Sequence, residues 1–174
     1  KNILLISSNR LGDCILSSGL HKFFKKKKEN VKITLVCGET PSQLFAYCDN
    51  IDRLIVLKKK SFSFHWFILW SKIFFTKWFR VVDLRGSAIT FFLYSQKNLR
   101  FKKKVNSKDH KVEEVTKSIA GKILAPTINL PNNLNFRDKN LRKIKLLKKT
   151  NNFVMIAPTA NWQGKIWPAE RFLE

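Results

Sequence analysis

Residues 1–13, KNILLISSNRLGD, decide the fold class of this chain. Residues 3–6 form a short apolar run without alternation, which is typical of a strand buried on both faces of a parallel sheet. After a polar turn, apolar residues recur at helical spacing, at Ile15, Leu16, Leu20, Phe23 and Phe24. The start of the chain therefore predicts a strand, a turn and a helix.

The alternation of strand and helix patterns continues to about residue 121. Apolar runs predict strands at 31–36, 53–57 and 80–84, and a basic strand-like piece follows at 99–108. Helical patterns lie between them at 41–46, 62–78, 87–94 and 112–121, the last ending at a glycine. Strands that alternate with helices predict right-handed crossovers and an open, parallel α/β sheet with helices on both faces.

The organisation changes near residue 124. A linker-like stretch with two prolines and several asparagines is followed by a charged helical pattern at 138–149, and a second buried run at 153–157 predicts the first strand of another Rossmann-like unit. We therefore expect a Rossmann-like domain at 1–124, a connecting segment at 125–150 and the beginning of a second domain at 151–174. Because the chain starts without methionine and stops just after a helix-start pattern, we interpret it as a fragment.

The composition indicates a basic protein of the cytoplasm. A net charge of +22 fits an anionic partner such as phosphate, nucleic acid or acidic lipid, although AT-rich coding explains the abundance of Lys, Asn, Ile and Phe equally well. Three cysteines, Cys14, Cys37 and Cys48, show neither a CxxC pair nor zinc spacing, so we expect reduced core residues. The first residues lack the pattern of a signal peptide, which favours the cytoplasm.

Two loops carry residues suited to chemistry. Gly12 would let the backbone approach a ligand, and Asp13 begins a predicted helix at the carboxyl end of the first strand, the edge where open α/β sheets bind ligands. A capping role for Asp13 is the alternative. The second loop, residues 157–168 (APTANWQGKIWP), has small, hydroxyl and amide groups and one lysine, a composition that suits a diphosphate.

Three motifs together resemble the lipopolysaccharide heptosyltransferases, family nine of the glycosyltransferases. A buried strand is followed by S-x-x-G-D-like residues at 8–13, a later strand by D-L-x-G-S at 83–87, and the predicted second domain opens with P-x-A-x-W-x-x-K-x-W-P at 158–168. The motifs occur in the family's order and cover essentially the whole chain. The resemblance implies a GT-B fold of two facing Rossmann-like halves, with a lipid-linked acceptor on the first half and the nucleotide sugar mainly on the second.

The resemblance also implies a reaction. A heptose would pass from ADP-heptose to the anionic inner core of lipopolysaccharide with inversion at the anomeric carbon, and with no metal or cofactor. Asp13 matches the general base, and Lys165 matches the lysine that contacts the diphosphate. Asn161 stands where relatives often carry Ser or Thr, and Thr159 is a further donor-binding candidate. We expect the fragment alone to be inactive.

On the acceptor side the candidates are Gly12, Asp83 and Ser87. Gly12 is carried over only as a residue that lets the backbone come close. Asp83 equally fits a strand-end residue that bonds backbone amides. His110 precedes a predicted helix, where a capping role is the simpler interpretation, and we assign it no chemistry.

Residues 62–79 are unusually aromatic, with Lys72 and Lys77 interleaved and three lysines just before them. A helix apolar nearly all round and flanked by lysines suits a bilayer interface, which would give peripheral contact with the inner face of the inner membrane. The alternative is a helix buried against the sheet, with its spare aromatic residues facing a neighbouring helix.

Two other functions stay open at this point. One is a transferase of a different nucleotide sugar. The other is a basic nucleic-acid-binding module, suggested by the charge and the aromatic residues. The sequence lacks an RNP-like aromatic strand, a GXXG loop, zinc spacing and a helix-turn-helix pattern, so we expect no specific nucleic-acid partner.

Overall fold

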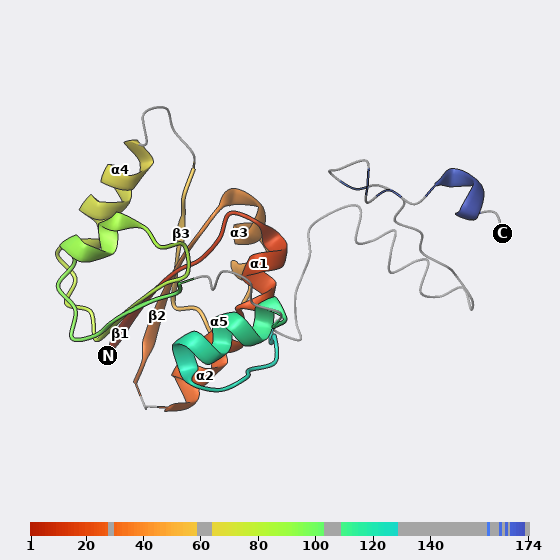
Figure 1. Cartoon of the computed structure of the whole chain (residues 1–174). Helices are drawn as coiled ribbons and strands as arrows, with labels where there is room; N and C mark the ends of the chain where they lie inside the picture. Colours follow the sequence, from red (N-terminus) through yellow and green to blue (C-terminus); the bar gives the residue numbers. More distant parts are fainter. Residues whose placement is uncertain are drawn as a thin grey trace. The chain divides into compact units, whose positions relative to one another are not determined.

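A computed structural model gives the fold of the chain (Figure 1). It describes residues 1–27, 30–58, 64–102, 109–128, 160, 164, 166 and 168–172. The chain divides into two compact units, Lys1–Leu134 and Asn135–Glu174. In the described part of the second unit, a short 3-10 helix, η4, spans Ala169–Phe172. The helix expected at 138–149 and the strand expected at 153–157 lie outside the described residues.

The first unit is built on a five-stranded parallel sheet. Its strands are β1 (Asn2–Ile6), β2 (Lys32–Cys37), β3 (Arg53–Val56), β4 (Arg80–Asp83) and β5 (Asn98–Arg100). They lie in the order β3-β2-β1-β4-β5, and every pair is parallel. The chain thus runs outward from β1 to β3 and then crosses back to the other side of β1 at β4. The predicted open, parallel α/β sheet is confirmed.

Helices cover both faces of this sheet (Figure 1). One face carries α1 (Leu11–Leu16), α2 (Gly19–Lys27), α3 (Glu39–Phe45) and α5 (Lys111–Ala120), and the other carries α4 (Phe64–Ile73) and the 3-10 helix η2 (Ala88–Phe92). Alternate residues of β1 supply the two cores: Ile3 and Leu5 join the first, and Leu4 and Ile6 join the second. The continuous apolar run at the start of the chain therefore reflects burial on both faces.

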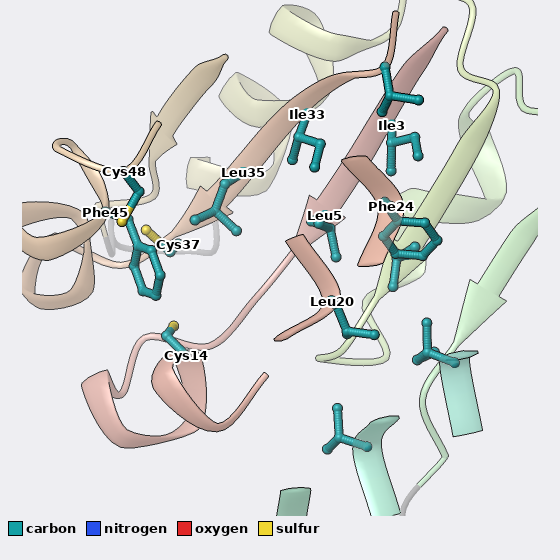
Figure 2. Packing of buried hydrophobic residues seen from close by; sticks show 14 residues of the cluster. Ile3, Leu5, Cys14, Leu20, Phe24, Ile33, Leu35, Cys37, Phe45 and Cys48 are labelled. Carbon is teal, nitrogen blue, oxygen red and sulfur yellow. The ribbon is translucent and has the colours of Figure 1, made fainter. Parts of the chain in front are cut away.

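The three cysteines belong to the first core, beside Phe45 and Leu35 (Figure 2). All three are free and buried. Burial raises the pKa of each thiol, to about 12 for Cys37. The expectation that the cysteines are core residues is confirmed.

The first predicted helix is two helices. The apolar spacing from Ile15 to Phe24 suggested one continuous helix, but α1 ends at Leu16 and α2 begins at Gly19. The hydroxyl of Ser17 donates to the carbonyl oxygen of Asp13 at 3.0 Å, and that of Ser18 donates to the carbonyl oxygen of Ile15 at 2.7 Å. Serine hydroxyls that bond nearby carbonyls offer the backbone an alternative to the helical ladder, so the break falls at these residues.

Two further helices are shorter than predicted. The helix expected to reach residue 78 ends at Ile73, because Trp78 turns back: its indole N–H donates to the carbonyl oxygen of Ile73 at 3.0 Å, and its amide donates to the carbonyl oxygen of Tyr94 at 3.1 Å. Trp78 is buried and forms a bridge with Ser95 ahead of β4. The helix expected at 87–94 is the five-residue 3-10 helix η2.

The last helix of the first unit agrees with its prediction. α5 ends at Gly121, whose φ of 74° is the left-handed conformation of a glycine C-cap. At its start His110 is the N-cap, and its Nδ1 accepts a hydrogen bond from the amide of Val112 at 3.4 Å. The capping interpretation of His110 is confirmed. Among the described residues, no helix combines the length and apolar character needed to cross a bilayer.

Candidate functional site

The loops that follow β1 and β4 meet at one edge of the sheet. Ile6 pairs with Asp83 in the parallel register, and the amide of Leu84 donates to the carbonyl oxygen of Ile6 at 2.9 Å. After β1 the chain passes to α1 on one face, and after β4 it passes to η2 on the other. In open α/β sheets the loops diverge at such a point and leave a crevice that binds ligands.

Asp13 lies at this edge, in the first turn of α1. The N-cap of the helix is Arg10, so Asp13 is the third helical residue and not the cap. The hydroxyl of Ser8 accepts from the amide of Arg10 and donates to Oδ2 of Asp13, both at 3.1 Å. In the described part of the chain, this hydroxyl is the only hydrogen-bond partner of the half-buried carboxylate. Within the described residues, no group donates a hydrogen bond to Oδ1.

Hydrogen bonds to β2 and to the residue that follows it fix the loop that carries Ser8. The amide of Ser7 donates to the carbonyl oxygen of Val36 at 2.8 Å, and the amide of Gly38 donates to that of Ser8 at 3.3 Å. A Cβ at Gly38 would lie 2.8 Å from the Cα of Asn9, closer than side chains pack. Gly38 is therefore a site-forming residue that sequence reasoning missed, although a glycine directly after a predicted strand was a usable signal.

Gly12 has a different environment. Apart from its chain neighbours and the backbone of α1, no atom of the described residues lies within 4 Å of a Cβ added there, and the residue is exposed. Internal packing does not require a glycine at this position. The space beside Gly12 is open to a ligand, as the expected close approach of the backbone would need.

Asp83 holds the second loop. It is fully buried, and its Oδ1 accepts from the amides of Arg85 and Gly86 at 2.9 and 3.0 Å. Its Oδ2 accepts from the hydroxyl of Ser87 at 2.9 Å and lies 4.0 Å from Nε of Arg100. These contacts match the strand-end interpretation of Asp83. They turn the Ser87 hydroxyl toward Asp83, and both residues shape the loop that presents Arg85.

A cavity of about 210 Å³ opens between the two loops and α5. Its lining includes Ser7, Ser8, Asp13, Ser17, Leu84, Arg85, Phe101, Lys111 and Val115. Arg85 donates to Oδ1 of Asn9 at 3.0 Å, and the ammonium of Lys111 lies 5.1 Å from the ring centre of Phe101. A carboxylate and two cations thus share one small cavity. A larger cavity, of about 590 Å³, opens between α2 and residues 120–127 and contains none of the predicted site residues.

Sequence reasoning missed Arg85 and Lys111 as site residues. Arg85 is the variable position of the D-L-x-G-S pattern, and Lys111 directly follows His110. Neither position stood out because lysine and arginine are abundant throughout the chain. The predicted donor-binding residues Thr159, Asn161 and Lys165 lie outside the described residues.

Comparisons with known proteins agree on the fold. No protein-family model matches the sequence, and no curated protein matches it. A family 9 glycosyl transferase from Veillonella parvula superposes with a TM-score of 0.73 at 19% identity, over 99% of this chain and 57% of that one. The E. coli heptosyltransferase WaaC superposes with TM-scores of 0.66 in its structure with ADP-2-deoxy-2-fluoro heptose and 0.61 with ADP, at 13% identity, over 98% of this chain.

These likenesses confirm the expected fold class, a Rossmann-like parallel-sheet domain of the GT-B type. The chain spans 57% to 62% of the length of the matched chains. At such low identity the likeness concerns the fold.

Proposed function

We propose that this chain is the acceptor-side part of an inverting glycosyltransferase that uses a nucleotide sugar. One observation carries the proposal. Asp13, held by the Ser8 hydroxyl through one oxygen, lines a small cationic cavity where β1 and β4 diverge. The similarity of fold to a family 9 glycosyl transferase and to a heptosyltransferase supports the same conclusion.

Asp13 is the proposed general base. Its ionised carboxylate takes the proton of the acceptor hydroxyl as that oxygen bonds to the anomeric carbon of the donor sugar. The bond from the anomeric carbon to the diphosphate breaks on the opposite face, and its electron pair leaves with the diphosphate, which inverts the anomeric centre. The hydroxyl of Ser8 fixes Oδ2, so Oδ1 is the oxygen that receives the proton.

The rest of the cavity favours an anionic acceptor. Arg85 and Lys111 bring two positive charges beside Asp13, and guanidinium and ammonium groups are the usual partners of phosphates and carboxylates. The acidic sugars and phosphates of the lipopolysaccharide inner core have this chemistry. We propose that Gly12 admits the acceptor, while Asp83 and Ser87 position the loop of Arg85.

For the donor we propose ADP-heptose. Two of the matched structures are of a heptosyltransferase with ADP or an analogue of ADP-heptose. Lys165 would offset the charge that develops on the departing diphosphate, and Asn161 and Thr159 would donate hydrogen bonds to it. The competing version is transfer from another nucleotide sugar, which a donor panel separates.

The test is transfer from ADP-heptose to a Kdo-bearing lipid A by the complete gene product. We expect Asp13→Asn to lower kcat by about 100-fold or more, the usual range for loss of a general base, with the KM for the donor nearly unchanged. Lys165→Ala should lower kcat and raise the KM for the donor. Asp49→Asn removes an exposed carboxylate elsewhere on the unit and is the matched control, with wild-type turnover.

Thermal unfolding of each variant shows whether the fold is kept. A folded Asp13→Asn variant with near wild-type turnover would contradict the base assignment. Transfer from a different nucleotide sugar, with none from ADP-heptose, would keep the mechanism and replace the donor.

A further inference from the structure

Exposed aromatic rings lie on α4 and η2 or directly beside them in the chain. The rings belong to Phe64, Phe67, Phe75, Phe91, Phe92 and Tyr94, each between 60% and 90% exposed. We call this surface the aromatic face. Single exposed apolar residues are ordinary on soluble proteins, but a contiguous exposed patch marks a site of interaction.

Contacts join part of the face across α4 and η2. α4 buries Leu69 and Ile73 against the sheet, and Trp70 packs, partly buried, against the same core. The ring centres of Phe67 and Trp70 are 6.0 Å apart, and those of Trp70 and Phe74 are 4.3 Å apart. The indole N–H of Trp70 donates to the carbonyl oxygen of Phe92 at 3.4 Å, which joins α4 to η2. A cavity of about 560 Å³, lined mainly by apolar side chains, lies between the two helices.

The segment of sequence that carries the face is strongly basic. Of residues 53–108, which include α4 and η2, 14 are Lys or Arg and one, Asp83, is acidic. Asp83 is fully buried, so it does not reach the surface. Lys72 and Lys77 are exposed beside the rings, and the guanidinium of Arg100 lies 4.2 Å from the ring centre of Phe91. Lys58, which lines a cavity together with Lys72, pairs with the exposed carboxylate of Glu39 at 3.0 Å. The described charges beside the rings are therefore mainly, but not only, positive.

We propose that the aromatic face docks on the surface of an anionic lipid bilayer. Aromatic rings favour the region of the lipid headgroups, and lysines can reach from an apolar surface to the phosphates. Anionic lipids attract such cations, so both parts of the face find a partner in the same surface. A second copy of the chain is a poorer partner, because it would place two mainly cationic surroundings against each other.

The aromatic face also reaches the candidate site. Ser87 lines the cavity between α4 and η2 and donates to the carboxylate of Asp83. Arg85 lines the cavity of Asp13, and its guanidinium lies 5.0 Å from the ring centre of Trp66. Docking would therefore hold the Asp13 cavity near the headgroups. This last step rests on the proposed function, whereas the docking itself does not.

The experiment measures binding of the complete protein to sedimented vesicles. One set contains phosphatidylethanolamine with phosphatidylglycerol, and the other contains phosphatidylcholine alone. The test variant is Phe67→Ser/Phe75→Ser/Phe91→Ser, and its matched control is Tyr47→Ser/Ile123→Ser, which removes exposed apolar side chains outside the face. We expect the wild type and the control to bind the anionic vesicles alike and the test variant to bind at least about tenfold more weakly.

A second pair separates docking from general attraction by charge. Lys72→Gln/Lys77→Gln should weaken binding about fivefold for each lysine, while Lys26→Gln/Lys122→Gln, on the opposite face of the sheet, should weaken it less. Brominated phosphatidylglycerol should quench tryptophan fluorescence of the wild type more than that of the Phe→Ser variant. Any of three results would overturn the proposal. The test and control variants could lose binding equally, or the wild type could fail to bind anionic vesicles. The third result is a dimer in solution that only the Phe→Ser variant abolishes. Loss of docking with transfer to a detergent-dispersed acceptor intact would leave the proposed function standing.

Discussion

At the scale of single residues, His21 makes the fold sensitive to pH. Its side chain is buried in α2, with its ring centre 5.4 Å from that of Phe45. Burial lowers the pKa of His21 from 6.5 to about 4. Between these two values the imidazole is protonated in the unfolded chain but neutral in the folded chain. The contribution of His21 to the free energy of unfolding is therefore complete only above pH 6.5.

We therefore expect the free energy of unfolding to fall as the pH drops from about 6.5 toward 4, with a slope from this residue that approaches about 1.4 kcal/mol per pH unit. Urea unfolding at several pH values measures it, with His21→Gln as the variant that cannot titrate. The pKa of Asp52 is lowered, because hydrogen bonds from Lys25 and from the amide of Ile33 outweigh the effect of burial. Asp52 therefore contributes to the free energy of unfolding throughout this pH range and loses that contribution only below its ordinary pKa, near 3.8. Identical slopes for the wild type and His21→Gln above pH 4.5 would contradict the expectation.

Asp13 and Asp83 also show what a sequence motif can and cannot predict. The position of Asp13 after the first strand was enough to place it at the edge of the sheet. The pattern at 83–87 placed Asp83 equally well but left its role open, because that role depends on burial. Arg100, from a strand that starts 15 residues later, approaches the same carboxylate, and no local pattern indicates such a contact.

At the scale of elements, the break between α1 and α2 creates a docking place for residues 124–127. The amide of Thr127 donates to the Ser18 hydroxyl at 2.9 Å, across 109 residues of sequence. Gly19 faces the carbonyl oxygen of Ala125, and a Cβ there would overlap that atom. The apolar spacing from Ile15 to Phe24 predicts one continuous helix. Such spacing indicates which side of a helix is buried, but it does not indicate which distant segment packs against that side.

Gly19→Ala should therefore destabilise the fold by about 1–3 kcal/mol, the usual cost of forcing atoms into a packed contact. Gly12→Ala is the matched control, since it makes the same change in α1 where no described residue outside the helix and its neighbours is close, and alanine there should stabilise the helix by up to about 1 kcal/mol. Urea unfolding of both variants gives the comparison. Equal stabilities would show that residues 124–127 do not press on α2 in solution.

At the scale of the whole molecule, the alternation of strands and helices predicted the parallel sheet, but the aromatic face could not be predicted with it. A helix that is apolar nearly all round shows no period that separates its buried side from its exposed side. The packing of Leu69 and Ile73 on the sheet decides which rings face outward, and η2 adds Phe92 beside Phe67 and Trp70. The two interpretations of the aromatic segment are thus compatible: α4 is packed on the sheet, and its spare rings form the surface we propose for the bilayer.

The two compact units lead to the last prediction, which concerns independent folding. The first unit, Lys1–Leu134, contains the whole sheet, both cores and α5 with its docked residues. We expect a chain of residues 1–134 to fold alone, with one cooperative unfolding transition and a near-UV circular dichroism spectrum from packed aromatic rings. A chain of residues 1–108 is the comparison: without α5 it exposes the part of the first core that Val115 and Ile119 cover, and it should aggregate or unfold without cooperativity. The contrary result is a chain of residues 1–134 that aggregates or unfolds without cooperativity, while residues 1–174 unfold cooperatively. The second unit would then belong to the same folding unit, and the division at residue 134 would be wrong.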